Sequence, residues 1–249
     1  MIRDYGAVYA GAWRYMLAVP LLFAVPTAVE FIQHVIEMKI GMYDGVAGAH
    51  AAESSSLRLG WGVVKTLSIT LALYWVARFF VLPGGAAAAR RFDPVAARLF
   101  AWVMAFGLVT TVLSLWGGAW MQAIGLGAFA QSAGIALFVI GLALTVLLAP
   151  WRVGAAIGRE DLGFLHSIAL VGLGLWWGVI FIIATSLPLM VAHYALSIAA
   201  VFAPPLAAKW ALLAFDAVLV GYLAAVMAAA DVVIARRALG RAGGALAPA

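Results

Sequence analysis

Six long, sparsely charged apolar stretches constrain the fold of this chain more than any other feature of its sequence. A helix needs about 20 mostly apolar residues to cross a bilayer. Six stretches meet that length: residues 13–36, 61–82, 99–121, 128–149, 168–194 and 207–234. Of all residues, 67% are hydrophobic and 10% are charged, whereas soluble domains carry roughly 25% charged residues. The sequence therefore predicts an all-α protein, a polytopic bundle of about six transmembrane helices.

The positions of the basic residues predict the orientation of this bundle. Cytoplasmic loops of membrane proteins carry an excess of Lys and Arg. With both chain ends inside, eleven basic residues fall on the cytoplasmic side and four outside, so we expect an N-in, C-in topology. The inner set is Arg3, Arg14, Arg78, Arg90, Arg91, Arg98, Arg152, Arg159, Arg236, Arg237 and Arg241, and the outer set is Lys39, Arg58, Lys65 and Lys209. Because this charge is spread over helix ends, we expect no nucleic-acid partner.

Two predicted cytoplasmic connections are similar in sequence. Each has a Pro at the helix exit and then an Ala pair, an Arg and an Asp, with an offset of 67 or 68 residues: Pro83, Ala88, Ala89, Arg91 and Asp93, then Pro150, Ala155, Ala156, Arg159 and Asp161. Proline ends a helix, and an Ala/Arg segment after it can lie along the headgroups, so we expect short amphipathic elbow helices there. Residues 1–249 form a single transmembrane domain. Either it is an internal duplication, about 62–125 and 128–195, as in many transporters, or helix exits in an Ala- and Arg-rich chain simply look alike.

Six spans, a long first outer loop with room for a short helix (residues 37–60) and Pro-led basic elbows give the chain its layout. This layout resembles that of uncharacterised bacterial six-helix membrane domains of the kind fused to glycerophosphodiester phosphodiesterases. The resemblance covers most of the chain and contains no specific motif. It implies a six-helix membrane fold. We expect no phosphodiesterase activity to carry over, because it belongs to the appended catalytic domain.

Residue types that common catalytic sites need are scarce. Cys and Asn are absent, which excludes disulfides and thiolate sites. The sequence has no Gly-x-Ser-x-Gly, His-Glu-x-x-His, P-loop or Gly-x-Gly-x-x-Gly motif. We therefore predict a non-enzymatic protein without a catalytic residue or cofactor.

Glu30, His34 and Glu37 form the most informative pattern in the sequence. Spacings of three and four place them on one stripe of a helix. On a helix continuous from Arg14, Glu30 would lie roughly 24 Å along the axis, in the outer third of the membrane. Ionisable groups at such depth usually face the bundle interior or a water-filled cavity.

Two further charged residues lie at comparable depth in other spans. Lys65 enters from outside on the second span, and Asp216 lies near the bilayer middle on the sixth. We predict that Glu30, His34, Lys65 and Asp216 meet, with Glu37 beside them. The partner of Asp216 is then either Lys65, or another residue or a water-filled cavity. Four interpretations stay open: an amphipathic surface helix with solvated charges, a structural ion-pair network, a substrate or ion pathway, and a metal or haem site.

The four histidines bear on the last of these interpretations. Intramembrane haem needs two facing His side chains, and His34 and His193 have matching depths, whereas His50 and His166 cannot form a second pair. We predict that no haem and no metal is bound.

Three function classes follow, in decreasing order of support. The first is transport or permeation of an ion, a lipid-like molecule or a small solute. The second is an accessory or assembly subunit of a larger membrane complex, and the third is an intramembrane metal or haem protein. We expect a multi-pass protein of a bacterial inner membrane, surrounded by lipids, with protein partners or further copies of itself within the bilayer.

Overall fold

A computed structural model describes residues 1–247, and these contain helices and no strand. Six helices within this range are long and apolar enough to cross a membrane, as expected of a multi-pass membrane protein. They are α2 (Pro20–Lys39), α4 (Ser56–Val81), α6 (Pro94–Ala123), α7 (Ala130–Leu147), α10 (Leu175–Phe202) and α11 (Leu206–Arg241). The shorter elements are α1 (Ile2–Ala18), α3 (Val46–Glu53), α5 (Ala86–Arg90), η1 (Gly127–Phe129), α8 (Ala149–Ala156), α9 (Phe164–Val171) and η2 (Gly172–Gly174).

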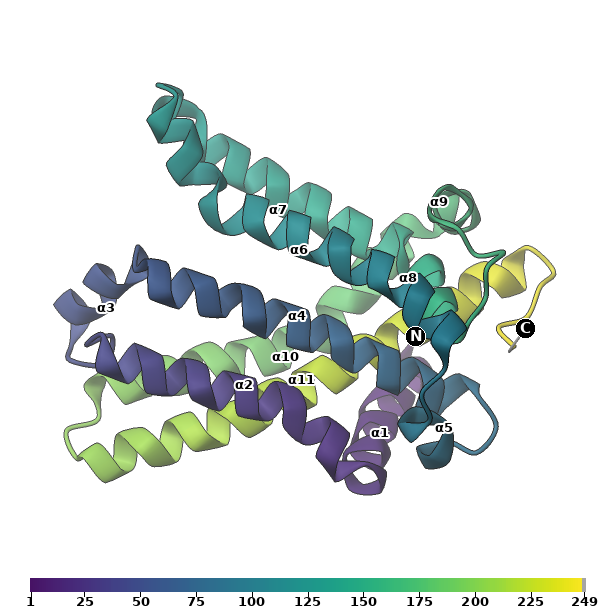
Figure 1. The fold of residues 1–249 in the computed structure, drawn as a ribbon, viewed down its shortest axis with the longest axis horizontal. Coiled ribbons are helices and arrows are strands. Elements are labelled where there is room, and N and C mark those ends of the chain that lie inside the picture. Colours follow the sequence, from purple (N-terminus) through teal and green to yellow (C-terminus); the bar gives the residue numbers. More distant parts are fainter. Residues whose placement is uncertain (248–249) are drawn as a thin grey trace.

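The short helices lie at the two ends of the bundle. Both chain ends, together with α1, α5, α8 and α9, lie at one end, and α3 lies at the other (Figure 1). Helix α3 occupies the long loop after the first span, where the sequence left room for a short helix.

The first span differs from its prediction. Residues 13–36 were expected to form one helix, but the chain breaks at Val19, between α1 and α2. Pro20 begins α2, and proline disfavours helical geometry in the residue before it while suiting the first position of a helix. Glu30 therefore lies ten residues into α2, about 15 Å along its axis and near its middle. The depth counted from Arg14 is wrong.

Helix α11 forms the centre of the bundle. In its most apolar stretch 72% of the residues are buried, against 6% in the stretch that contains α7. It packs against α10, α2, α4, α1 and α8. Its buried face is rich in alanine, including Ala224, Ala225, Ala228, Ala229 and Ala230. Small residues let helix backbones approach closely, which is how membrane helices gain packing contacts.

Helix α8 is not the surface elbow that the sequence predicted. Six of its eight residues are buried, and it packs against α11, α6 and α4. The run of small residues allows this burial, because a Cβ added at Gly154 would lie 2.7 Å from the Cβ of Leu162. After the second span, where the other elbow was predicted, the extended Leu82 and a turn at residues 83–85 lead into the five-residue helix α5.

Candidate functional site

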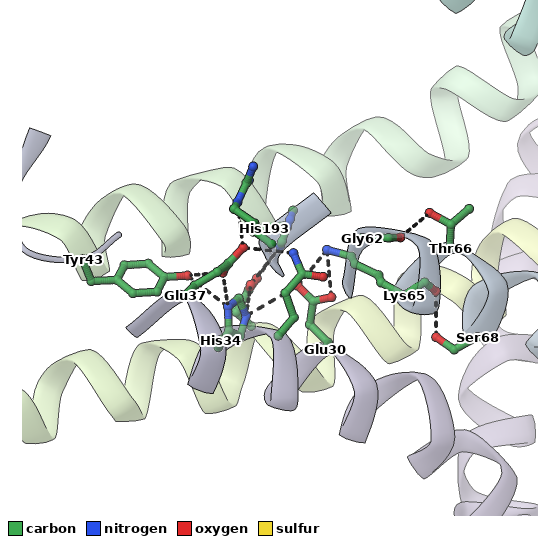
Figure 2. Close-up of polar contacts among 12 residues, drawn as sticks. Glu30, His34, Glu37, Tyr43, Gly62, Lys65, Thr66, Ser68 and His193 are labelled. Carbon is green, nitrogen blue, oxygen red and sulfur yellow. Dashed lines mark hydrogen bonds and ion pairs between the residues drawn. The ribbon is translucent and has the colours of Figure 1, made fainter. Parts of the chain in front are cut away.

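A buried polar cluster lies where α2, α4, α10 and α11 meet, toward the α3 end of the bundle. Its members, hereafter the polar cluster, are Glu30, Gln33, His34, Glu37, Tyr43, Arg58, Lys65, His193 and Asp216. Figure 2 shows the labelled members of this cluster pointing toward one another: Glu30, His34, Glu37, Tyr43, Lys65 and His193. All of the predicted residues are here. The polar side chains of the Glu30–Glu37 stretch are buried whereas its apolar Phe31 and Ile32 are exposed, so this is not a surface helix with solvated charges.

Asp216 is the innermost acceptor of the polar cluster. It is 0% exposed, and its carboxylate meets two imidazoles. The Nε2 atom of His34 lies 2.9 Å from Oδ2, and the Nδ1 atom of His193 lies 2.8 Å from Oδ1. The alternative in which Asp216 pairs with Lys65 is wrong. Depth along a helix can be estimated from sequence, but the direction in which each side chain points across the bundle cannot.

His34 has carboxylate oxygens at both ring nitrogens. Besides Asp216, its Nε2 atom lies 3.5 Å from Oε1 of Glu30, and its Nδ1 atom lies 3.1 Å from Oε2 of Glu37. A neutral imidazole donates one hydrogen bond only. The Tyr43 hydroxyl also lies 3.0 Å from Nδ1 and can act as a donor there. The two facing carboxylates therefore favour a second positive centre, either a second proton or a bound cation, without requiring it.

Glu37 is held by four neighbours. Gln33 donates to Oε1 over 2.9 Å, and Arg58 donates to the same oxygen over 3.1 Å. The Tyr43 hydroxyl donates to Oε2 over 2.9 Å, beside the His34 contact already described. Burial, together with the adjacent Glu37 carboxylate, raises the pKa of Tyr43, so the phenol keeps its proton and remains a donor. Glu37 is thus a fixed acceptor behind His34.

Lys65 pairs with Glu30. Its Nζ atom lies 2.8 Å from both carboxylate oxygens, and Glu30 is 1% exposed whereas the Lys65 side chain is 21% exposed. Lys209 contacts the backbone carbonyl of Tyr43 and no carboxylate of the cluster. Because the chain breaks at Val19 and α2 begins at Pro20, Glu30 lies near the middle of α2. Lys65 pairs with it there.

The charges of the polar cluster do not cancel. Glu30, Glu37 and Asp216 supply three negative charges, and Arg58 and Lys65 supply two positive ones. With neutral imidazoles, one negative charge remains in a buried space between membrane-spanning helices. Placing such a charge in an apolar environment is expensive unless it is paired. The arrangement therefore favours one additional cation.

Sequence reasoning missed Tyr43 and Arg58, which lie in or beside the long loop and reach back to Glu37. It also missed Arg78, which is 2% exposed and donates to the carbonyls of Ala88, Arg91 and Ala156. No sequence signal separates a buried arginine from one at an interface, since both occur at helix ends.

The Glu30–Lys65 pair gives a test of these contacts. We expect Lys65→Met to destabilise the protein by about 3–5 kcal/mol, because Glu30 stays buried without its partner. Glu30→Gln should cost less, since the half-buried lysine can turn toward water. The double variant should lose less stability than the sum of the two single changes. Thermal unfolding in detergent measures this, and strictly additive losses would contradict the pairing.

Comparisons of the chain with protein-family models, with curated proteins and with solved structures return no match.

Proposed function

We propose that this chain is a transport or permeation protein of a bacterial inner membrane that moves a cation, with the polar cluster as its binding site. The observation that carries the proposal is that three buried carboxylates among membrane-spanning helices face only two basic side chains, so that one more positive charge, a bound cation or a proton on His34, balances them. Ionisable groups within membrane-spanning helices are rare, face the bundle interior or a water-filled cavity, and mark ion or substrate pathways and proton relays.

The polar cluster is accessible at its rim. The side chains of Arg58, Lys65 and His193 are 28%, 21% and 13% exposed, whereas those of Glu30 and Asp216 are closed off. A cation can thus approach past the basic side chains without opening the helix packing around Asp216.

A second polar station lies on the same helix toward the other end of the bundle. Asp231 lies 15 residues after Asp216 on α11, about 22 Å along the axis. It pairs with Arg152 at 2.9 Å. Arg152 also borders a cavity of about 110 Å³ between α4, α6 and α7, whose lining includes Thr70 and Thr110. Hydroxyl groups and an arginine make this cavity suitable for water. The polar cluster and the Arg152–Asp231 pair thus lie at two depths along the central helix α11. A path across the bundle explains two such sites better than a single structural ion-pair network does.

Flux in proteoliposomes tests the proposed function. Purified protein should carry cations across vesicles loaded with reporters for H⁺, Na⁺, K⁺ or divalent ions, and Asp216→Asn should lower the rate at least about tenfold. His193→Ala serves as a second variant if Asp216→Asn does not fold, and His50→Ala, on the exposed α3, is the matched control. Flux equal to that of protein-free vesicles, or unchanged in both cluster variants, would overturn the proposal.

An accessory-subunit role is the second candidate. Helix α7 leaves Ile135, Phe138 and Val139 more than half exposed, and a Cβ added at Gly134 or Gly141 meets nothing within 4 Å. A partner helix could pack closely on this face, as lipid also could. A partner that co-purifies at fixed stoichiometry in mild detergent, together with absent flux, would favour this candidate.

The N-in, C-in orientation is part of the proposal. It places the polar cluster in the outer half of the membrane and the Arg152–Asp231 pair in the inner half. With cysteines introduced singly at the exposed Ser54 and Ala242, we expect an impermeant maleimide to label Ser54→Cys but not Ala242→Cys in intact spheroplasts. After lysis both should react. Labelling restricted to Ala242→Cys in intact spheroplasts would show the opposite orientation.

A further inference from the structure

We infer that the polar cluster binds a divalent transition-metal ion of the zinc type, with Glu30, His193 and Asp216 as ligands and His34 as the fourth. The inference names the cation of the proposed site, and it rests on the proposed function for the idea that the cluster takes a cation at all. This proposal of a zinc-type site replaces the prediction from sequence that no metal is bound.

The spacing of the donor atoms supports a single metal ion. One ligand atom from each of Glu30, His193 and Asp216 lies within 4.8 Å of the other two. The Nε2 atom of His34 borders the same space, 2.9 Å from Asp216 and 3.5 Å from Glu30. Zinc–ligand bonds of about 2.0–2.2 Å in a tetrahedron place ligand atoms roughly 3.4 Å apart. The donor pairs at 2.8 and 2.9 Å would have to separate by about 0.5 Å to admit the ion, and any pair near the 4.8 Å bound would have to approach.

The types of donor favour zinc-like ions over calcium or magnesium. Two imidazoles and two carboxylates form a mixed set, and imidazole nitrogen suits Zn²⁺ and its transition-metal neighbours. Calcium takes 6–8 oxygen ligands and magnesium demands an octahedron rich in water. This cluster combines the carboxylates of Glu30 and Asp216 with two imidazole nitrogens, which matches neither coordination. The Tyr43 hydroxyl and the Gln33 amide nitrogen donate to Glu37, so that only the Gln33 amide oxygen is left as a further neutral oxygen ligand.

The surroundings of His34 are those of a metal-ligating histidine. Such a ring donates its other N–H group to a carboxylate, which fixes its orientation and increases its basicity. Glu37 is in that position behind His34, at 3.1 Å from Nδ1, and is itself held by Arg58. If Nε2 binds the ion, both nitrogens of the ring have suitable partners.

Lys65 has a distinct role in this arrangement. Its ammonium group lies 2.8 Å from both oxygens of Glu30, where it competes with a metal ion for that carboxylate. The side chain is partly exposed and can withdraw toward the rim. Removing the lysine should therefore strengthen metal binding, whereas removing a ligand should weaken it. A structural ion-pair network predicts no such opposite signs.

Zinc binding by the tag-free full-length protein in detergent tests the inference. In competition with a chromophoric chelator, we expect one Zn²⁺ per chain and an increase in the thermal midpoint. His193→Ala and Glu30→Gln should weaken binding at least about tenfold. Lys65→Met should bind more tightly, and zinc should restore part of its lost stability. His50→Ala, whose side chain is 72% exposed, should bind as the wild type does, and Mg²⁺ should not compete.

Several outcomes would overturn the inference. These are no stoichiometric binding, binding unchanged in His193→Ala and Glu30→Gln, loss of binding only in His50→Ala, or weaker binding in Lys65→Met. Zinc binding without flux of any cation would leave the metal site in place and remove the proposed transport. Flux of other cations without zinc binding would do the reverse.

Discussion

Replacing Asp216 with leucine is expected to be among the most destabilising single changes in the polar cluster. The substitution leaves His34 and His193 facing a space without the acceptor that both contact now, at 2.9 and 2.8 Å. Leaving a buried donor without its acceptor costs about 1–3 kcal/mol for each of the two imidazoles, because both rings stay desolvated. Thermal unfolding in detergent, with the same measurement on Asp216→Asn, gives the size of the loss.

Asp161 provides the matched control. It also pairs with a basic side chain, Arg159, but is 58% exposed at the end of the bundle that holds the termini. Exposed ion pairs contribute about 0–1 kcal/mol, so Asp161→Leu should change little. Equal losses in the two aspartate variants would mean that Asp216 is not the buried anchor of the polar cluster.

The second large effect is expected at Arg78. Its guanidinium donates to the carbonyls of Ala88 at 3.2 Å, Ala156 at 3.2 Å and Arg91 at 3.3 Å, and thereby ties α4 to α5, to α8 and to the loop between α5 and α6. It also lies over the ring of Tyr74, 5.2 Å from its centroid. Arg78→Met keeps the apolar stem but leaves these carbonyls without their donor, which should cost about 3 kcal/mol or more.

Arg236 serves as the comparison for Arg78. It is exposed and donates to a single carbonyl, that of Phe80, at 2.7 Å. Arg236→Met should cost about 1 kcal/mol or less. Unfolding midpoints of the two variants in one detergent check the difference. Similar small losses would show that α5 and α8 are held by apolar packing alone.

The spans could be predicted from sequence because their apolar runs are long and few helix-breaking residues interrupt them. The residues of the site could also be predicted, since Glu30, His34 and Glu37 repeat at helical spacing in an otherwise apolar stretch. Their pairing could not, because it depends on the break before Pro20 and on the rotation of α11, which places Asp216 toward two histidines.

Other features of the structure could not be predicted from the sequence. Tyr43 and Arg58 join the polar cluster through the fold of the loop that contains α3, and no periodicity marks them. The burial of α8 is a tertiary effect of small residues that can equally lie at a membrane surface. The internal repeat of 62–125 and 128–195 and the resemblance to phosphodiesterase-linked membrane domains stay predictions.

The central claim is that the polar cluster takes a cation, and anomalous diffraction at the zinc edge from crystals grown with Zn²⁺ tests it most directly. We predict one peak per chain, about 2.0–2.2 Å from donor atoms of Glu30, His193 and Asp216, with Lys65 withdrawn from Glu30. Crystals of His193→Ala should show a weaker peak or none. A peak only at surface histidines, with the Lys65–Glu30 pair intact in the presence of zinc, would contradict the account.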